Sequence, residues 1–351
     1  MSGRRLRVGI DAWNLPHDRR GIGRYLRALL DAFAGPFATE IACTLIVPEW
    51  PAWTVAARYR AAANGHRFRV RSRRAARWVG LDLLWFPFNG MSWEAPWLPT
   101  VATLHDASTF VLPGYGDDAR APFLRAARKA SRIITDSRYC AEELARVLPY
   151  PRERIDAIPL AVSSPLPPRS VPLDIVALGR FVLFVGESEP RKGLPVLAEA
   201  VKRLRESGAA LRLVIVGHVA AHSEIPGDAT VLGHIDDATL AALYRACAVF
   251  AYPSRYEGFG LPVLEAMSYG APVVASHATA IPEAGGDAAL YVPPDDAEAL
   301  AAALGRVLGD EGYAAELRRA GLARAAEMTW DKTAAATIDA FTRATRPPPS
   351  P

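Results

Sequence analysis

Two glutamates in one short segment are the first residues of this sequence that could do chemistry together. Glu257 and Glu265 belong to PSRYEGFGLPVLE, residues 253–265, which follows an apolar run and precedes an amphipathic stretch. The first glutamate is therefore expected on a loop between a strand and a helix, and the second about one turn into that helix. Gly258 and Gly260 leave backbone amides near the helix start open to an anion or a sugar hydroxyl. The segment predicts two carboxylates that point into one cleft.

A basic motif follows an earlier apolar run. The motif GESEPRKGL begins at Gly186 and carries Arg191 and Lys192 just before a predicted helix. Fixed positive charge beside free backbone amides suits a diphosphate. Basic residues in a loop are also commonly only solvated, so this motif by itself leaves both interpretations open.

The first half of the chain offers two weaker motifs. The stretch GIGRY at 21–25, with Gly23 at its centre, opens a predicted helix but lacks the third glycine of a dinucleotide-binding turn. His105 and Asp106 follow an apolar run at 100–104, and catalytic groups gather at the carboxyl ends of parallel strands. A lone histidine there is more often structural, and Asp106 is expected to cap a helix or loop.

Taken together and in this order, the motifs resemble those of the family-4 retaining glycosyltransferases, over the chain from Val8 to about Ala344. The resemblance implies an α/β GT-B fold, in which two Rossmann-like doubly wound domains face each other across a cleft. It implies transfer of a hexose from a nucleotide diphosphate sugar with retained anomeric configuration. Glu257 would contact the transferred sugar near its phosphate-bearing carbon, and Glu265 would hold the ribose hydroxyls.

The same resemblance assigns roles to the remaining motif residues. Arg191 and Lys192 would neutralise the leaving diphosphate, and His105 would lie near the transferred sugar without acting as a nucleophile. Many family members carry Arg where Glu187 stands here, so the phosphate charge would rest more heavily on Arg191 and Lys192. Ile235 would read the base through its backbone. Together with Glu265, the expected donor-binding positions are Gly23, Gly186, Ile235, Gly258, Phe259, Gly260 and Leu261.

Two series of alternating strands and helices are predicted to position these residues, because short apolar runs alternate with amphipathic stretches along the chain. Four prolines in SSPLPPRSVP, residues 163–172, interrupt the pattern and predict a linker. We therefore expect the following divisions: an acceptor-side domain at 1–165, a nucleotide-sugar domain at 166–329, a helix at 330–345 that crosses back to the first domain, and a disordered tail at 346–351.

Composition indicates where the protein resides and whether it needs a metal. The basic start meets Gly9 and Asp11 after a very short apolar run, and no window approaches about 18 uninterrupted apolar residues, so we expect a cytoplasmic protein. Cys43, Cys140 and Cys247 are far apart and are expected as buried thiols. No acidic metal-binding motif is recognisable, so the sequence predicts neither a metal nor another cofactor.

Charge is divided unevenly along the chain. Residues 1–165 hold 24 Lys and Arg against 15 Asp and Glu, a balance of +9, and the remainder balances at −5, which gives the total of +4. Arginines alternate with other residues from Arg67 to Arg73 as on one face of a strand, and Arg74 and Arg77 follow. Two interpretations stay open: a solvated edge strand, or a surface that meets lipid headgroups or a diphosphate-bearing acceptor.

Functions other than glycosyl transfer are also to be considered for this sequence. A sugar-nucleotide epimerase could share the architecture, and a catalytically inactive transferase-like scaffold is the alternative that is not an enzyme. A dehydrogenase is disfavoured by the missing third glycine. The forms GIGRYL, PRKGL and EGFGLPVLEAM look most like bacterial mannosyltransferases of polysaccharide or O-antigen assembly, so GDP-mannose is the leading donor and a saccharide or lipid-linked saccharide the expected acceptor. We expect no nucleic-acid partner.

Overall fold

A computed structural model describes residues 4–18, 21–48, 53–220 and 225–346. The chain packs as two compact units, which are described separately. The first comprises Met1–Leu160 together with Trp330–Pro351, and the second comprises Ala161–Thr329. Residues 158–171, around the division, form neither helix nor strand, and the proline-rich segment predicted as a linker begins inside this stretch. The predicted tail falls almost entirely on residues 347–351, which lie outside the described residues.

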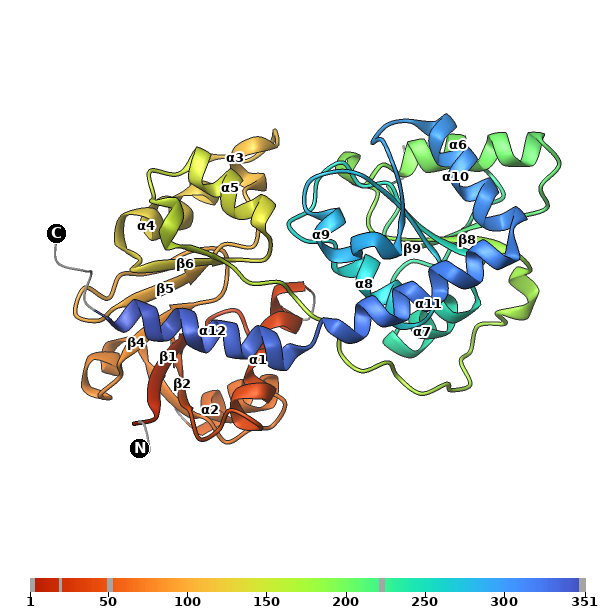
Figure 1. Ribbon diagram of the computed structural model, residues 1–351. Helices are drawn as coiled ribbons and strands as arrows, with labels where there is room; N and C mark the ends of the chain where they lie inside the picture. The colour runs from red at the N-terminus through yellow and green to blue at the C-terminus, as the bar shows by residue number, and fades with distance from the viewer. Residues whose placement is uncertain (1–3, 19–20, 49–52, 221–224, 347–351) are drawn as a thin grey trace. The chain divides into compact units, whose positions relative to one another are not determined.

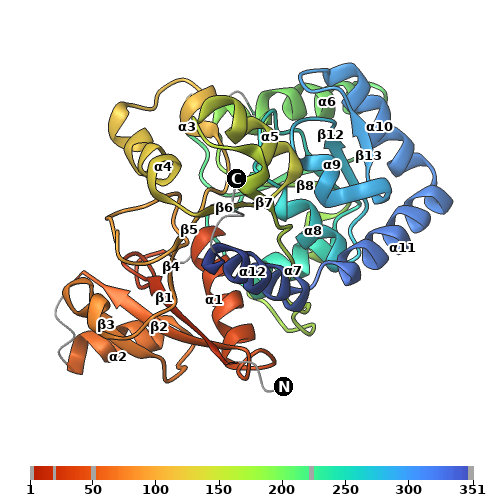
Figure 2. The ribbon, with the colours of Figure 1, turned by 60° about the vertical axis from the view of Figure 1, so that its left-hand side comes forward.

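The first unit is built on a parallel sheet of seven strands in the order β3-β2-β1-β4-β5-β6-β7 (Figures 1 and 2). Consecutive residues of the central strand β1, from Val8 to Asp11, are buried, as a sheet with both faces covered requires. The strand order reverses direction between β1 and β4, and ligands of doubly wound sheets bind beyond the carboxyl ends of the strands at such a point. The strands are β1 (Leu6–Asp11), β2 (Ile41–Val47), β3 (Arg69–Ser72), β4 (Leu83–Phe86), β5 (Thr100–Thr103), β6 (Arg132–Thr135) and β7 (Ile155–Ala157).

Crossover segments connect these strands, as parallel pairing requires, and most of them contain helices. The helix α5 has a serine cap at its start, where the Ser137 side chain accepts a hydrogen bond from the backbone N–H of Cys140. The helices of the first unit are α1 (Gly21–Ala34), α2 (Trp53–Ala62), α3 (Ser108–Val111), α4 (Asp117–Lys129), α5 (Arg138–Val147) and α12 (Trp330–Thr345), with short 3₁₀ turns at Arg73–Trp78 and Arg152–Arg154.

The last helix, α12, belongs to the first unit although it follows the second along the chain. Figure 2 shows it beside α1. The Phe341 ring packs against the rings of Phe33 and Trp85, at centroid distances of 6.4 and 5.3 Å. The hydroxyl of Thr333 donates to the carbonyl of Pro159 at 2.9 Å. Apolar packing and hydrogen bonding therefore both hold α12 on this unit.

The second unit repeats the plan with six parallel strands in the order β10-β9-β8-β11-β12-β13, and its order reverses between β8 and β11. The strands are β8 (Phe181–Val185), β9 (Arg212–Val216), β10 (Thr230–Val231), β11 (Val249–Tyr252), β12 (Val273–Ser276) and β13 (Leu290–Val292). The helices are α6 (Leu194–Glu206), α7 (Asp237–Ala246), α8 (Leu261–Ser268), α9 (Ile281–Gly285), α10 (Ala297–Gly309) and α11 (Glu311–Glu327), with 3₁₀ turns at Val176–Leu178, Pro190–Lys192 and Gly286–Ala288.

One sequence expectation about strand β3 of the first unit is wrong. The arginine alternation predicts a strand face that runs to Arg73, but β3 ends at Ser72 because the Ser72 hydroxyl caps a 3₁₀ turn by accepting from the N–H of Ala75. The turn directs Arg73 inward, where its Nη2 lies 3.2 Å from Asp11 Oδ1 and 2.9 Å from Ser92 Oγ. Arg73 therefore neutralises a buried carboxylate and does not extend the exposed arginine face.

Candidate active site

The two main motifs of the second unit meet because they leave neighbouring strands. The PRKG motif, residues 190–193, follows β8, and the EGFG motif, residues 257–260, follows β11. These two strands pair directly where the sheet order reverses. Gly193 marks the closest approach of the two loops. Its φ of +68° favours glycine, and a Cβ at this position would collide with the backbone carbonyl of Pro253. The backbone N–H of Arg255 also donates to the Arg191 carbonyl at 2.7 Å.

Glu257 is held by both basic side chains of the PRKG motif. Lys192 Nζ donates to Glu257 Oε1 at 2.7 Å, and Arg191 Nη1 lies 3.4 Å from Glu257 Oε2. The Lys192 and Glu257 side chains are only 13% and 11% exposed, so solvent screens their attraction weakly. Burial by itself would raise the pKa of the Glu257 carboxyl, but Lys192 and then Arg191 outweigh it and hold that pKa below its usual 4.5. Glu257 is a carboxylate at neutral pH.

The sequence did not reveal three further partners of this cluster. Glu189 accepts from Arg191 Nε at 2.6 Å. The Lys192 ammonium lies over the buried ring of Tyr252, 5.6 Å from its centroid. Thr279 holds the EGFG loop through its hydroxyl, which accepts from the backbone N–H of Glu257 at 3.0 Å and lies 3.1 Å from the Glu257 carbonyl.

Cationic donors remain for a ligand at this cluster. The four side chains Arg191, Lys192, Glu189 and Glu257 sum to zero charge, so they form a neutral arrangement without a ligand. Among the described residues, Arg191 Nη2 has no hydrogen-bond acceptor. Lys192 has three N–H donors, of which one binds Glu257 and a second lies 3.5 Å from the Tyr252 hydroxyl. These donors can bind phosphate oxygens while the ion pairs to Glu257 persist.

The other predicted donor-binding residues of this segment lie around the start of α8. Gly260 precedes the helix with φ of +104°, and Leu261 is its first residue. Phe259 is only 3% exposed, so its ring is not available to a ligand. Glu265 lies in the second turn of α8 and is half-buried.

Gly186 and Ile235 are linked through the end of β9. The Gly186 N–H donates to the Val216 carbonyl at 2.9 Å, and a Cβ on the next residue, Gly217, would collide with the Gly186 carbonyl. Gly217 bridges to Gly233, two residues before the half-buried Ile235. This close backbone contact ties the segment of Ile235 to the carboxyl ends of β8 and β9, beside the PRKG motif.

In the first unit, His105 is a buried and fully bonded imidazole. Its Nδ1 lies 2.8 Å from Asp136 Oδ2, and its Nε2 lies 3.0 Å from the Pro87 carbonyl oxygen. The Tyr25 ring packs edge-on against it at 5.0 Å, and the His105 backbone N–H donates to Asn89 Oδ1 at 2.9 Å. Two acceptors are satisfied together only by a doubly protonated ring.

Electrostatics agree with that protonation state. Burial would lower the pKa of His105, but the negative charge and hydrogen bond of Asp136 outweigh it and raise the pKa above its usual 6.5. A ring with both nitrogens occupied has no lone pair for a proton. His105 can therefore supply fixed positive charge, whereas the sequence alone left its chemistry open.

Two further expectations in this unit concern Asp106 and Gly23. The Asp106 carboxylate accepts from the Ser108 N–H at 2.9 Å at the start of α3, the capping role that the sequence predicts. Gly23 lies in the first turn of α1, where a Cβ would collide with the Asp18 carbonyl, so the position excludes any side chain. Asp11, Ser92 and Arg73 form a further cluster at the end of β1, which sequence reasoning missed because its members are far apart along the chain.

No group of three or more His, Cys, Asp or Glu side chains that could hold a metal ion occurs in the part of the chain that the structure describes. All three cysteines are free; Cys140 and Cys247 are buried, and Cys43 is half-buried.

Comparison with known proteins defines the class. The model of glycosyltransferase family 4 matches residues 20–164, and the model of glycosyl transferases group 1 matches residues 179–310. The chain is 32% identical over 299 residues to O-antigen chain mannosyltransferase B of Escherichia coli, a match that covers 78% of each protein. The protein belongs to the family-4, group 1 glycosyltransferases and is a hexosyltransferase.

Two further relatives support this placement. MMP alpha-(1->4)-mannosyltransferase of Mycolicibacterium hassiacum is 32% identical over 63% of this chain, which spans 56% of that relative's length. The solved structure of Anabaena Alr3699/HepE in complex with UDP and glucose matches with a TM-score of 0.72 and 18% identity, over 96% of this chain and 99% of that one. The fold of two parallel-sheet α/β units is thus the GT-B fold that the motifs predict.

Proposed function

We propose that this glycosyltransferase moves mannose from GDP-mannose, with retained anomeric configuration, to a saccharide or lipid-linked saccharide. The observation that carries the proposal is the contact of Lys192 and Arg191 with Glu257 where the second sheet reverses its order. The names of the relatives in Escherichia coli and Mycolicibacterium hassiacum favour mannose as the sugar.

In this proposal the second unit binds the donor. Arg191 and Lys192 bind the diphosphate and stabilise the negative charge that develops as the bond to the sugar breaks. The carboxylate of Glu257 orients both cations and lies against the transferred sugar. Glu265 holds the ribose, and the backbone amides before α8 contribute hydrogen bonds without a side chain in the way.

Retention follows in this proposal from attack on the face that the leaving group vacates. The acceptor hydroxyl gives its proton to the departing phosphate oxygen, so no enzymic nucleophile is needed. A double displacement would instead need a carboxylate on the opposite face of the sugar. His105 is doubly protonated because its two nitrogens donate to Asp136 and to the Pro87 carbonyl, so it contributes positive charge and no base.

We also propose that no metal or other cofactor takes part. The guanidinium of Arg191 and the ammonium of Lys192 supply the charge that a divalent ion supplies elsewhere. Activity that survives EDTA supports this, and activity that EDTA abolishes and magnesium or manganese restores refutes it.

A donor screen tests the assignment directly. GDP-, UDP-, ADP- and TDP-sugars are compared by thermal shift and by hydrolysis, because a ligand at about 100 times its dissociation constant adds about 2.7 kcal/mol to the free energy of unfolding. The anomeric configuration of the product is then read by NMR with the preferred donor and a saccharide acceptor. Release of an epimerised sugar nucleotide without acceptor would instead identify an epimerase, and binding without turnover would identify a scaffold.

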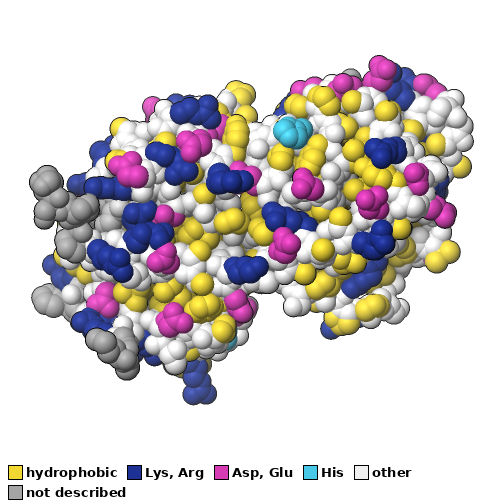
Figure 3. Space-filling model, viewed as in Figure 1, with side chains coloured by type: hydrophobic (Ala, Val, Ile, Leu, Met, Phe, Trp, Pro, Cys, Tyr) yellow, Lys and Arg dark blue, Asp and Glu magenta, His cyan; other side chains and the backbone are white. Residues whose placement is uncertain are grey.

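Membrane association is the remaining part of the proposal. Among the described residues no helix is both long and apolar enough to cross a bilayer. Lys and Arg side chains are numerous on the first unit (Figure 3), and Arg67, Arg69, Arg71, Arg74 and Arg77 are exposed. Each basic residue near an anionic surface contributes about 1 kcal/mol, so these five could hold the first unit reversibly beside a lipid-linked acceptor.

A further inference from the structure

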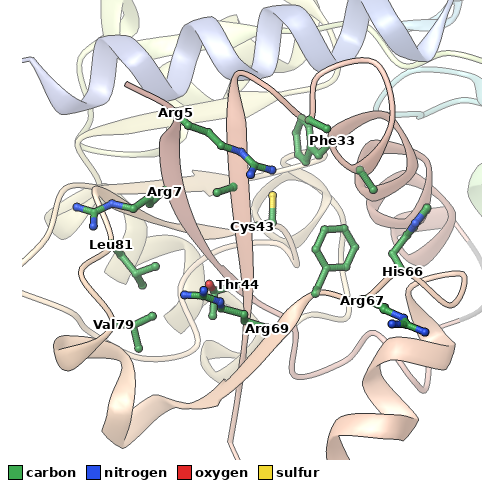
Figure 4. Close-up of a pocket in the computed structure, with 14 residues that line it drawn as sticks. Arg5, Arg7, Phe33, Cys43, Thr44, His66, Arg67, Arg69, Val79 and Leu81 are labelled. Atoms are coloured by element: carbon green, nitrogen blue, oxygen red, sulfur yellow. The ribbon is translucent and has the colours of Figure 1, made fainter. Parts of the chain in front are cut away.

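A cavity of about 450 Å³ opens in the first unit at the amino-terminal ends of β1, β2 and β3. Figure 4 shows the side chains that line it. Arg5 precedes β1, residues 42–44 begin β2, and Arg67 precedes β3. The candidate catalytic residues of this unit follow the opposite, carboxyl ends of the strands. The six residues of β1, at about 3.3 Å each, place Asp11 roughly 20 Å from Arg5.

The wall of this cavity is strongly basic. Arg5, Arg7, Arg67, Arg69 and His66 line it, and no Asp or Glu is among its lining residues. Its remaining lining residues are mostly apolar and include Phe33, Phe68 and Leu81.

Some of these charges are already compensated. The Arg7 guanidinium binds Asp82, with Nη2 at 3.1 Å from Oδ1, and His66 Nε2 lies 2.8 Å from Asp31 Oδ1. Arg5 Nε donates to the Ile41 carbonyl, which carries no full charge.

Arg67, which precedes β3, and Arg69, its first residue, are not compensated in this way. Within the part of the chain that the structure describes, no carboxylate forms an ion pair with Arg67 or Arg69. Desolvation raises the pKa of Cys43 to about 12, so its thiol stays protonated and adds no negative charge. Arg5, Arg67 and Arg69 are exposed and therefore leave an uncompensated positive charge at the mouth of the cavity.

Protection of an edge strand does not explain the arrangement. Charged side chains on an edge discourage strand pairing when they face solvent, and β3 is the edge of its sheet. Here, however, Arg67 and Arg69 line one cavity with Arg7 of β1, an interior strand, and with Arg5, which precedes that strand. Guanidinium groups from two separate strands around an apolar floor are instead suited to an anion with several acceptor oxygens.

We infer that this cavity is a phosphate-binding site separate from the donor site. Its volume falls within the 300–1,000 Å³ that ligand pockets commonly have. The guanidinium groups bind the phosphate oxygens, and Phe33, Phe68 and Leu81 pack against whatever apolar group the phosphate carries. The same chemistry serves a soluble phosphate ester and the headgroup of a phospholipid, so the two sources are separated by experiment.

The test compares two double variants of equal charge. Arg67→Ser with Arg69→Ser removes the uncompensated charges from the cavity. Arg74→Ser with Arg77→Ser removes two exposed arginines of the same region that do not line it. Inorganic phosphate and glycerol 3-phosphate are titrated into each protein by calorimetry, with GDP in excess to occupy the donor site. A second arm measures flotation with phosphatidylcholine vesicles, with and without phosphatidic acid.

The expected result is one bound phosphate per chain in the wild type and a loss of affinity of roughly tenfold or more in the cavity variant, because two charge-assisted contacts are removed. The control variant should keep its affinity. Arg74 and Arg77 are proposed above to attract anionic vesicles in general. A signal confined to vesicles that contain phosphatidic acid, with a clearly larger loss in the cavity variant than in the control variant, therefore identifies a lipid headgroup as the source. Equal losses in both variants, or no binding in either arm, overturn the inference. Arg67 and Arg69 are exposed, so unchanged thermal unfolding should accompany their replacement.

Discussion

Replacement of Glu257 by glutamine isolates its negative charge from its shape. The amide can still accept from Lys192, and the backbone contacts of residue 257 with Thr279 do not depend on the side chain. The change leaves Lys192 and Arg191 with an excess positive charge where the leaving diphosphate is proposed to bind. Glu257→Gln should therefore weaken catalysis while it strengthens the binding of GDP.

The magnitudes follow from the geometry. At 2.7 Å and an effective dielectric constant of about 20, the attraction between Lys192 and Glu257 is about 6 kcal/mol, much of it offset by desolvation. Since the amide keeps a hydrogen bond, we expect the variant to lose about 2–3 kcal/mol of stability, or about 5–10 °C in the unfolding midpoint of the second unit. Loss of charge stabilisation at the reacting centre should lower kcat by about 10²–10³-fold.

In Glu257→Gln the affinity for GDP should rise although kcat falls. An added net charge beside the diphosphate should tighten GDP binding by about fivefold, equivalent to about 1 kcal/mol. Calorimetry measures this, and initial rates with saturating donor measure kcat. The matched control is Glu189→Gln, which removes the other carboxylate bound to Arg191. Glu189 is 45% exposed, so its loss should change kcat by no more than about fivefold.

The reasoning fails if Glu257→Gln turns over within a few fold of the wild type. It also fails if both glutamine variants lower kcat equally, because the effect would then come from Arg191 and not from the carboxylate beside the sugar. Weaker GDP binding in Glu257→Gln would show that the carboxylate contributes to the diphosphate site in some way other than charge balance.

The pH dependence of the same residue adds an independent measurement. Because its folded pKa is depressed, ionised Glu257 contributes stability that is present above its unfolded pKa, near 4.5, and is lost as pH falls through the lower folded pKa. Thermal unfolding followed from neutral to acid pH should therefore fall less steeply below about pH 4.5 in Glu257→Gln than in the wild type. Identical slopes would contradict the assigned ion pairs.

Four further outcomes are expected. Asp136→Asn should lower the pKa of His105, so that NMR finds the imidazole neutral at a pH where the wild type is protonated; an unchanged pKa would contradict the ion pair. Thr279→Ala should destabilise the EGFG loop by about 1–3 kcal/mol in thermal unfolding, whereas Thr279→Ser should not. Rates with and without EDTA should be equal. Sedimentation with vesicles should require anionic lipid, weaken as salt rises and fall in Arg71→Ser with Arg74→Ser; indifference to anionic vesicles at low salt would favour a soluble acceptor.

Much of the proposed donor site was predictable because each of its motifs lies at a strand end. The apolar runs that become β8 and β11 are clear in the sequence, so the loops of Arg191, Lys192 and Glu257 could be located before the structure was known. The partners of these residues could not. Lys192 and Glu257 are 65 residues apart, and they meet only because β8 and β11 pair at the reversal of the sheet order.

The same limit applies to the first unit. His105 was a plain candidate after an apolar run, but its bond to Asp136 depends on the pairing of β5 with β6. Arg73 was predicted on a strand because its spacing fits one, yet the Ser72 cap ends β3 and directs Arg73 toward Asp11. A local side-chain hydrogen bond thus overrides a period of two.

The sequence by itself determined the family, the alternation of strands and helices, and the loops that carry the charged motifs, because these depend on local patterns of apolar residues, glycine and proline. Only the tertiary structure decided which charges neutralise one another and which remain available. The pairing of Glu257 with Lys192, the double protonation of His105 and the basic cavity at Arg67 and Arg69 all depend on strand order and burial. Electrostatic interaction depends on distance in space and on exclusion of water, and neither quantity is fixed by separation along the chain.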